Sequence, residues 1–449
     1  MTRDGRHLGI TVMPEWIQSE GIEGVLRSLA RAGATAVATS PYVMARSDAA
    51  DAGREPPIDA DAGKVRLLDR DLWGAREIRC TTAPSYVPDL ALYDGLRYRP
   101  SAPTDLTRSQ GPLVGRFLEA AAQAGLETHL QVQAAIPPGY RVQFGGPEED
   151  DKPRLPDGSL HEGRVDKNAS LASPQVVAYV RALLRDLARA YPMIDAVRID
   201  WPEYPPYSLD SWFFDFNTHA VRTATARGYD VARMRRDAAA CMRDPSIFVT
   251  RGAEIPTGFC RLQDFKAELS LDLVRACRDA LPASLRLVAH AFPPPWARLS
   301  GMDLHRVGAI ADDVALKLYT MHWPMMLDGY ARRIEAAGCR MARPEILARL
   351  QELFDTGEAP AERMRYPEPE EAHPVSAASQ RRKIETAAAE LGGAGATLTP
   401  AAHSYGPTED ALARIRTAFE AGRGRVWINR YGYMSDAKLD GVGRMMREG

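Results

Sequence analysis

A short run of residues near the middle of the chain carries the side chains with the clearest chemical potential. It reads Val197-Arg-Ile-Asp-Trp-Pro-Glu-Tyr-Pro-Pro-Tyr207, and its first part has the alternation of a β-strand. Alternation places Arg198 and Asp200 on one strand face, so we expect the guanidinium to hydrogen-bond the carboxylate and keep it ionised. A fixed, ionised carboxylate can attack or stabilise an electron-poor carbon. The alternative is an internal salt bridge that only fills the core.

Two glutamates are candidates to donate a proton beside that carboxylate. Glu203 follows Asp200 closely in a loop that neighbouring prolines stiffen, and Glu15 follows the first predicted strand. General acid catalysis needs such a carboxyl group within reach of the leaving atom. Either glutamate could instead bind a hydroxyl group.

Polar and aromatic residues follow the other predicted strands at the point where each strand ends. Aromatic faces cover the apolar faces of a sugar ring, and polar side chains bind its hydroxyl edge, so this mixture favours a carbohydrate site. The alternative is that the loops pack their own aromatic side chains on the rim. Gln131 and Gln133 also belong to this set. The residues expected to bind substrate are Arg198, Trp16, Trp201, Tyr207, His290, Lys317, Tyr319, His322, Trp323, His403, Tyr405 and Arg430.

The spacing of apolar residues predicts the elements that must position these side chains. Short β-rich runs alternate with helix-period stretches, which is typical of βα units in a parallel sheet. We therefore predict an α/β fold, a closed (β/α)8 TIM barrel, whose reacting groups meet at the carboxyl ends of the strands. An open doubly wound sheet is disfavoured because no glycine-rich turn follows the first strand. The predicted strands span 8–13, 34–39, 127–133, 194–200, 285–290, 314–319, 396–402 and 425–430.

Three segments are longer than ordinary connections, and they follow predicted strands two, three and six. We interpret residues 1–449 as a single catalytic domain. Segments 45–110 and 140–170 are expected to be loop insertions at the carboxyl face of the strands, where long loops often build binding sites. Segment 334–385 is expected to be a helical and acidic insertion.

Composition excludes several classes of function. Lys and Arg number 57 against 59 Asp and Glu, a net charge of −2, so nucleic acid and anionic membranes are not expected partners. The first apolar stretch is too short for a signal or a membrane span, which predicts a cytoplasmic protein. Five cysteines without a C-x-x-C pair argue against a disulfide framework and a thiolate zinc site. We expect a small carbohydrate as substrate and no cofactor, and the oligomeric state stays open.

The chain resembles the hypothetical glycoside-hydrolase-like (β/α)8 barrel proteins within the glycosidase TIM-barrel superfamily. The resemblance implies hydrolysis of a carbohydrate or glycoside, with Asp200 at the anomeric carbon and Glu203 or Glu15 as acid. The Arg-x-Asp pattern also looks like the α-amylase arrangement. That arrangement places the glutamate that acts as general acid at the end of strand five, where this chain has His290 between two alanines. The stretches that carry the resemblance are 173–179, 197–206, 316–324 and 429–433.

Other classes of function stay open. Lys317 lies among apolar residues on the sixth predicted strand and could form a Schiff base, as in a lyase or aldolase. His290, His322 and His403 could meet Asp200 around a divalent metal, although none has a reinforcing His-x-His spacing. The missing Glu on strand five also makes a non-catalytic sugar-binding barrel conceivable.

Overall fold

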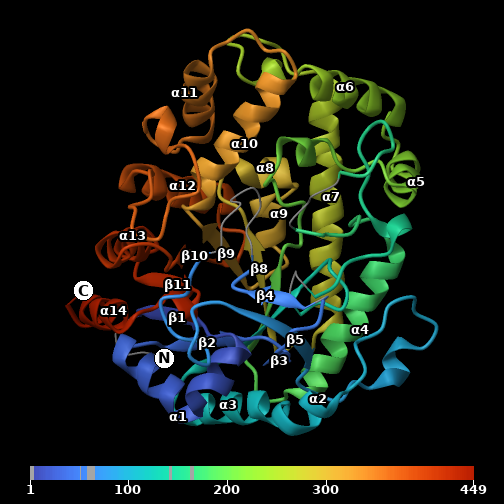
Figure 1. Cartoon of the computed structure of the whole chain (residues 1–449). Coiled ribbons are helices and arrows are strands. Elements are labelled where there is room, and N and C mark those ends of the chain that lie inside the picture. Colours follow the sequence, from blue (N-terminus) through green and yellow to red (C-terminus); the bar gives the residue numbers. More distant parts are fainter. Residues whose placement is uncertain (1–4, 51, 58–65, 141–143, 162–165, 449) are drawn as a thin grey trace.

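Eight parallel strands close into a barrel at the centre of the molecule (Figure 1). The computed structural model describes residues 5–50, 52–57, 66–140, 144–161 and 166–448. The strand order around the barrel is β1-β11-β10-β9-β8-β7-β6-β2, so the predicted (β/α)8 barrel is confirmed. The strands are β1 (His7–Thr11), β2 (Ala36–Thr39), β6 (Glu127–Gln133), β7 (Ala196–Asp200), β8 (Arg286–Ala291), β9 (Asp313–Leu318), β10 (Thr397–His403) and β11 (Arg425–Asn429).

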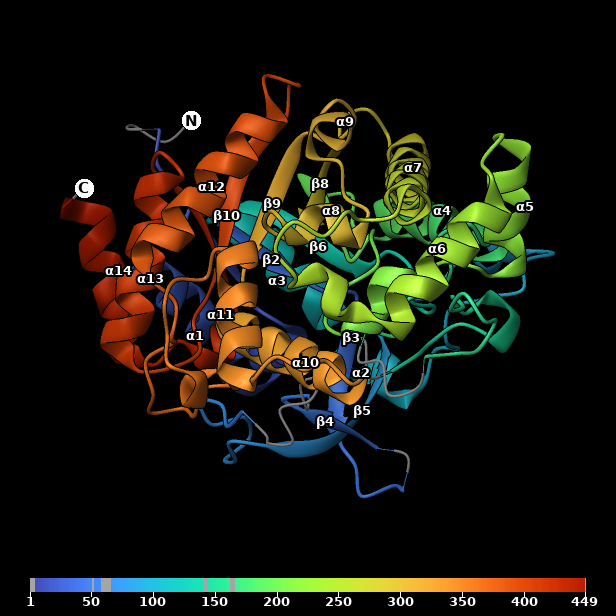
Figure 2. The same cartoon turned by 90° about the horizontal axis from the view of Figure 1, so that it is seen from above.

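Helices surround the barrel and cover the outer face of its strands (Figure 2). The helix before β7 illustrates how local sequence sets the boundaries, because the Ser173 hydroxyl accepts from the backbone amide of Val176 and Pro174 occupies the first turn. The helices that follow or precede barrel strands are α1 (Pro14–Ala32), α3 (Pro112–Gln123), α4 (Pro174–Ala190), α7 (Thr257–Ala280), α9 (Leu304–Gly308), α10 (His322–Ala336), α12 (Ala377–Leu391), α13 (Thr408–Ala421) and α14 (Asp436–Glu448).

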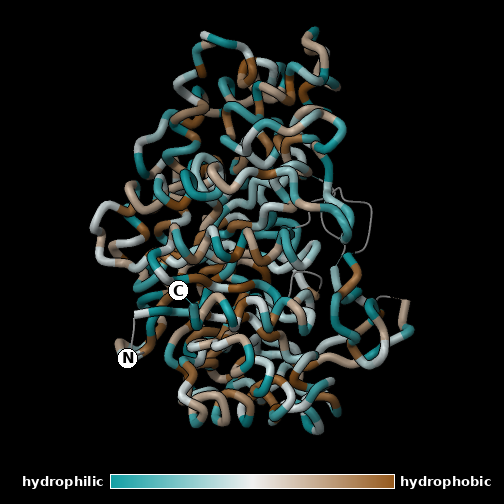
Figure 3. Tube along the Cα trace, turned by 90° about the vertical axis from the view of Figure 1, so that its left-hand side faces the viewer, coloured by the Kyte–Doolittle hydropathy of each residue, from teal (hydrophilic) through white to brown (hydrophobic). Residues whose placement is uncertain are grey.

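Additional elements follow β2, β6, β7, β8 and β9. A three-stranded antiparallel sheet with the order β3-β5-β4 follows β2. Hydrophilic and hydrophobic residues alternate along much of the outer chain, as helices with one buried face require (Figure 3). None of the described helices combines the length and apolar composition of a membrane span. The additional elements include β3 (Tyr42–Arg46), β4 (Gly53–Glu55), β5 (Ile78–Pro84), α2 (Asp105–Gln110), α5 (Thr218–Ala226), α6 (Val231–Arg243), α8 (Trp296–Ser300) and α11 (Arg343–Phe354).

The interior of the barrel has an unusual mixture of small, aromatic and polar side chains. Trp427 projects inward from β11 and lies against β1, where a Cβ atom added to Gly9 would be 2.1 Å from its ring. The indole nitrogen of Trp427 donates a hydrogen bond of 2.8 Å to the Thr11 hydroxyl. One large ring therefore fills this part of the barrel, and small residues such as Ala36 and Ala401 pack around it.

Asp313 is buried in the barrel interior at the start of β9, and its pKa links the stability of the protein to pH. Its Oδ2 accepts a hydrogen bond of 2.8 Å from the Thr399 hydroxyl. Burial raises the pKa of Asp313 from 3.8 to about 6, although Arg198 and Arg425 act in the opposite direction. The folded state therefore binds more protons than the unfolded state between these pH values, and stability is lost as the pH rises through about 6.

We expect Asp313→Asn to raise the free energy of unfolding by on the order of 2–3 kcal/mol at about pH 7.5, because the buried charge is removed. The Asn side chain can still accept from Thr399. Urea unfolding at several pH values measures the effect, and the difference should disappear below about pH 4. A variant that is less stable than the wild type at about pH 7.5 contradicts this interpretation.

Candidate active site

Asp200 is the last residue of β7, and three groups of the protein contact its carboxylate. Its Oδ1 lies 3.2 Å from Lys317 Nζ and 3.2 Å from His290 Nδ1. The same oxygen accepts a hydrogen bond of 3.0 Å from the Trp201 amide. Burial acts to raise the pKa of Asp200, but Lys317 and His290 outweigh it and lower the pKa below its ordinary value. Asp200 is therefore an ionised carboxylate, and 12% of its side chain remains exposed.

Glu203 shares Lys317 with Asp200 but has a different environment. Its Oε1 accepts from Lys317 Nζ at 3.0 Å, and its Oε2 accepts from the Ser300 hydroxyl at 2.7 Å. The side chain has no exposed area. Burial raises the pKa of Glu203 although the neighbouring ammonium opposes the rise. The two carboxyl groups around one lysine thus have pKa values that are shifted in opposite directions.

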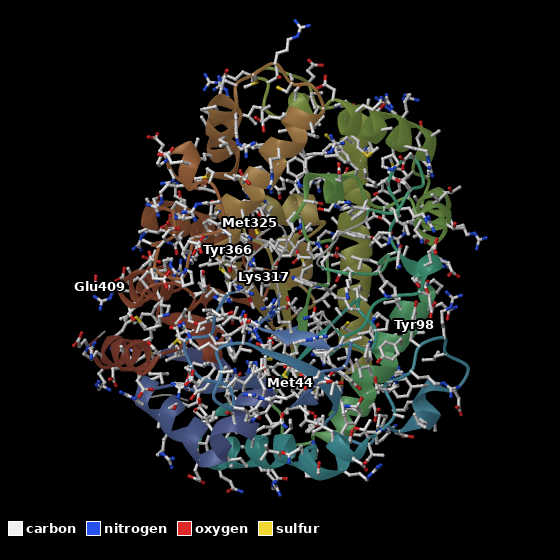
Figure 4. The ribbon with its side chains drawn as sticks, in the orientation of Figure 1. Met44, Tyr98, Lys317, Met325, Tyr366 and Glu409 are labelled. Atoms are coloured by element: carbon white, nitrogen blue, oxygen red, sulfur yellow. The ribbon has the colours of Figure 1, made fainter. Side chains whose placement is uncertain are left out.

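Lys317 projects into the barrel from β9 and lies near the centre of the molecule, as Figure 4 shows. Its ammonium group is 4.3 Å from the ring centroid of Phe292 and 5.8 Å from that of Trp201. The amine is therefore paired with two carboxylates and lies within cation–π distance of two rings. An amine held in this way is not free to attack a carbonyl carbon, so these contacts do not support the lyase or aldolase alternative.

The backbone after Asp200 adopts a conformation that is rare for a large residue. Trp201 has a φ of 51°, in the left-handed region. The Asn168 amide nitrogen donates to the backbone carbonyls of Trp201 at 2.9 Å and Glu203 at 2.6 Å. Backbone strain of this kind occurs where surrounding contacts impose it, often at functional sites. Asn168 therefore fixes the loop that carries both Trp201 and Glu203.

Arg198 does not contact Asp200 in the way the sequence predicted. Its Nε donates to His290 Nε2 at 3.2 Å, and its Nη1 lies 3.4 Å from His129 Nδ1. The guanidinium carbon is 3.8 Å from the ring centroid of Trp427. The expected hydrogen bond to Asp200 is therefore wrong, because the guanidinium lies flat on an indole ring between two histidines. His290 lies between Arg198 and Asp200 and contacts both.

The Arg198 contact fixes the hydrogen position on His290. Since Nε2 accepts from Arg198, the proton of the neutral imidazole belongs on Nδ1, which faces Asp200. Burial lowers the pKa of His290 to about 4, against the opposing effect of Asp200. The histidine is thus neutral at physiological pH, and its Nδ1 lies 3.2 Å from the carboxylate.

Nuclear magnetic resonance of protein with ¹⁵N-labelled histidine checks this assignment. At about pH 6.5 we expect His290 to be neutral with its proton on Nδ1, although an unperturbed histidine would be half protonated. Arg198→Met removes the donor to Nε2 and should allow the other tautomer to appear. An imidazolium signal for His290 in the wild type at this pH contradicts the assignment.

Aromatic side chains near Asp200 form a continuous series of ring contacts. The Tyr207 ring lies 5.9 Å from Trp201 and 5.3 Å from His322. Tyr319 contacts His322 at 6.0 Å and His403 at 5.4 Å. The structure therefore brings together residues predicted from strands four, six and seven.

Other predicted site residues lie elsewhere. Trp16 is 1% exposed and packs on Tyr431, and Trp323 is 2% exposed and packs on Trp296. The expectation that Trp16 and Trp323 stack on a sugar is wrong, because α1 and α10 begin immediately at these positions and turn the rings into the core. Three more predicted site residues have partners outside the Asp200 environment. Glu15 accepts a hydrogen bond of 2.8 Å from the Tyr42 hydroxyl, the Tyr405 hydroxyl donates one of 2.9 Å to the Pro367 carbonyl, and Arg430 forms an ion pair with Glu55.

Several residues of the Asp200 environment are not among the site residues predicted from the sequence. His129 alternates with Gln131 and Gln133 on β6, and this alternation was the available signal that His129 faces the barrel interior. Ser300 lies at the end of the short helix α8, far from Glu203 in the chain, and has no local signal. The same is true of Phe292, which follows β8 and contacts Lys317.

The histidines do not form a metal site in the part of the chain that the structure describes. His290 contacts Asp200, whereas His322 and His403 lie around the Tyr319 ring. Within the described ranges, no group of three or more His, Cys, Asp or Glu residues could hold a metal ion. The zinc alternative therefore has no ligand set among these residues.

Comparison with known proteins supports the fold. No protein-family model matches the chain, and no curated protein matches its sequence. A β-galactosidase from the psychrophilic Marinomonas ef1 superposes with a TM-score of 0.54 at 12% identity; the match covers 98% of this chain and 59% of that chain. The catalytic domain of a β-amylase from Paenibacillus polymyxa gives a TM-score of 0.53 at 11% identity, with 98% of both chains covered. This chain thus spans 59% of the β-galactosidase, and it has the closed parallel barrel found in these glycoside hydrolases.

Proposed function

We propose that the protein is a glycoside hydrolase-like enzyme that acts on a carbohydrate or glycoside through the carboxylate of Asp200. One observation carries the proposal: Lys317 and His290 hold Asp200 ionised, and part of its side chain is exposed at the carboxyl end of a barrel strand. In barrels of this type the reacting groups lie at that end. The similarity in fold to a β-galactosidase and a β-amylase supports the choice of substrate class.

Asp200 would attack or stabilise the anomeric carbon as positive charge develops in an oxocarbenium-like transition state. The opposite pKa shifts of Asp200 and Glu203 support distinct roles, since a pair of carboxyl groups with separated pKa values commonly divides into base and acid. Glu203 is therefore the preferred proton donor. Glu15 accepts a hydrogen bond from the Tyr42 hydroxyl and is less well supported as the proton donor.

The surrounding side chains would bind the sugar. Trp201 and Tyr207 would contact its apolar faces, while Tyr319 would bind a hydroxyl group. The Nδ1 atom of His403 accepts from the Tyr405 amide at 3.1 Å, so its Nε2 carries the proton and can donate to an oxygen of the substrate.

Turnover of aryl glycosides with leaving groups of different basicity tests the proposal. The wild type should cleave at least one member of a panel of nitrophenyl glycosides. Glu203→Gln should lower turnover most for the poorest leaving group, because a good leaving group departs without a proton. Absence of cleavage across the panel contradicts the proposal, and a loss that does not depend on the leaving group removes Glu203 as the acid.

A specific observation also favours a second candidate, a sugar-binding barrel without hydrolytic activity. Glu203 and Glu15 are fully buried, so of the three candidate carboxylates only Asp200 is accessible to a ligand in this structure. Such a protein would be stabilised thermally by a sugar but would not release nitrophenol. Thermal denaturation of the wild type with and without each glycoside, in parallel with the turnover assay, separates the two candidates.

A further inference from the structure

Several buried polar atoms beside Asp200 make no hydrogen bond with the residues that the structure describes. They include Oε1 of Gln131, Oε1 of Gln133 and Nη2 of Arg198. Buried polar groups in proteins almost always have a partner, which can be a protein group, an ordered water or a ligand. Three such atoms on two neighbouring strands therefore indicate that something else binds there.

The strand register places these atoms next to the candidate catalytic carboxylate. Gln131 is paired with Arg198 across β6 and β7, and Gln133 is paired with Asp200. Neighbouring strands are about 4.8 Å apart, so side chains of paired residues on the same face lie in contact. His129 contacts Arg198 and the Trp427 ring inside the barrel, and the period of two puts Gln131 and Gln133 on this interior face as well.

The chemistry of the group favours a ligand that both donates and accepts hydrogen bonds. The two amide oxygens accept hydrogen bonds, the guanidinium nitrogen donates one, and the ionised Asp200 accepts further bonds. A hydroxyl group can donate to an amide oxygen and accept from the guanidinium in the same position. A carboxylate or phosphate would instead face Asp200 and two other acceptors, and an apolar group would leave all three atoms unsatisfied.

We propose that Gln131, Gln133 and Arg198 form a hydroxyl-binding subsite that determines which sugars the protein accepts. Gln133 lies level with Asp200 and binds a hydroxyl close to the reacting carbon, whereas Gln131 and Arg198 bind a hydroxyl deeper in the barrel. The inference rests on the proposed function and extends it to a substrate class: an uncharged sugar ring with two free hydroxyl groups on its buried edge.

Gln131→Met and Gln133→Met test the subsite with methyl glycosides of glucose and galactose, in both anomeric forms, as probes in titration calorimetry. Each variant should bind the best of these probes about 10-fold more weakly than the wild type, the effect of losing one well-formed hydrogen bond. The loss should disappear for the monodeoxy derivative that lacks the hydroxyl in question. Because neither amide oxygen accepts a hydrogen bond from the described residues, the melting temperature of the unliganded variants should not fall.

Gln263→Met is the matched control. Gln263 is also buried, and its Oε1 likewise makes no hydrogen bond with the described residues, but it lies on α7, away from Asp200, and its Nε2 donates a hydrogen bond of 2.9 Å to the Trp212 carbonyl. This variant should melt at a lower temperature and bind the probes as the wild type does. Unchanged affinity in both barrel variants, or a melting temperature lowered as in Gln263→Met, overturns the subsite and leaves the proposed function in place. Failure of the wild type to bind any methyl glycoside overturns both.

Discussion

Asp200→Asn is expected to lower kcat/KM for the cleaved aryl glycosides by at least about 1,000-fold. The carboxamide has nearly the shape of the carboxylate but carries no negative charge to attack or stabilise the anomeric carbon. Lys317 keeps its ion pair with Glu203 in the variant, so the fold is expected to persist. Steady-state kinetics and a thermal denaturation curve of the same preparation measure the two effects.

Asp313→Asn is the matched control for this result. It makes the same chemical change in another buried aspartate of the barrel interior, at the start of a strand and not at its carboxyl end. Its activity should stay within about threefold of the wild type, since reacting groups lie at the opposite end of the barrel. An Asp200→Asn variant that is also this active would remove the proposed mechanism.

Lys317→Met is expected to lower the free energy of unfolding by about 3–5 kcal/mol near neutral pH, because it leaves two buried carboxyl groups without their shared cation. The methionine retains the apolar length of the side chain but not the bonds of 3.0 and 3.2 Å to Glu203 and Asp200. The deficit should shrink as the pH falls, since protonation then neutralises the carboxyl groups. Urea unfolding at several pH values measures both effects.

Two further variants make this prediction specific. Arg251→Met breaks an ion pair of 3.1 Å with Glu352 whose side chains are 70% and 64% exposed, and it should change stability by less than about 1 kcal/mol. Lys317→Met combined with Glu203→Gln removes one of the two carboxyl groups that lack their cation. The double variant should therefore recover part of the lost free energy of unfolding. A Lys317→Met protein as stable as Arg251→Met contradicts the role assigned to Lys317.

The barrel could be predicted from the sequence because each strand carries its own local signal. The run predicted over 127–133 coincides with β6 (Glu127–Gln133), and the run over 194–200 contains β7 (Ala196–Asp200). Strand ends are equally local, so Asp200, His290 and Lys317 could be expected at one end of the barrel before their contacts were known. Their convergence follows from closure of the sheet.

The contacts inside the barrel could not be predicted because they depend on residues far apart in the chain. Arg198 turns away from Asp200 because Trp427 presents a flat ring and His129 and His290 lie on either side. Trp427 occupies that position because Gly9, more than 400 residues earlier, leaves it room. Strand alternation gives the face of a residue but not its partners on that face.

A crystal structure of Asp200→Asn with a bound glycoside would show whether the side chain at position 200 faces the reacting carbon. We expect a sugar ring at the carboxyl end of β7, with its anomeric carbon about 3–3.5 Å from that side chain. Its buried hydroxyl groups should contact Gln131 and Gln133. A sugar bound away from position 200, with Trp201, Tyr207 and Tyr319 making no contact to it, would show that Asp200 does not act on the substrate.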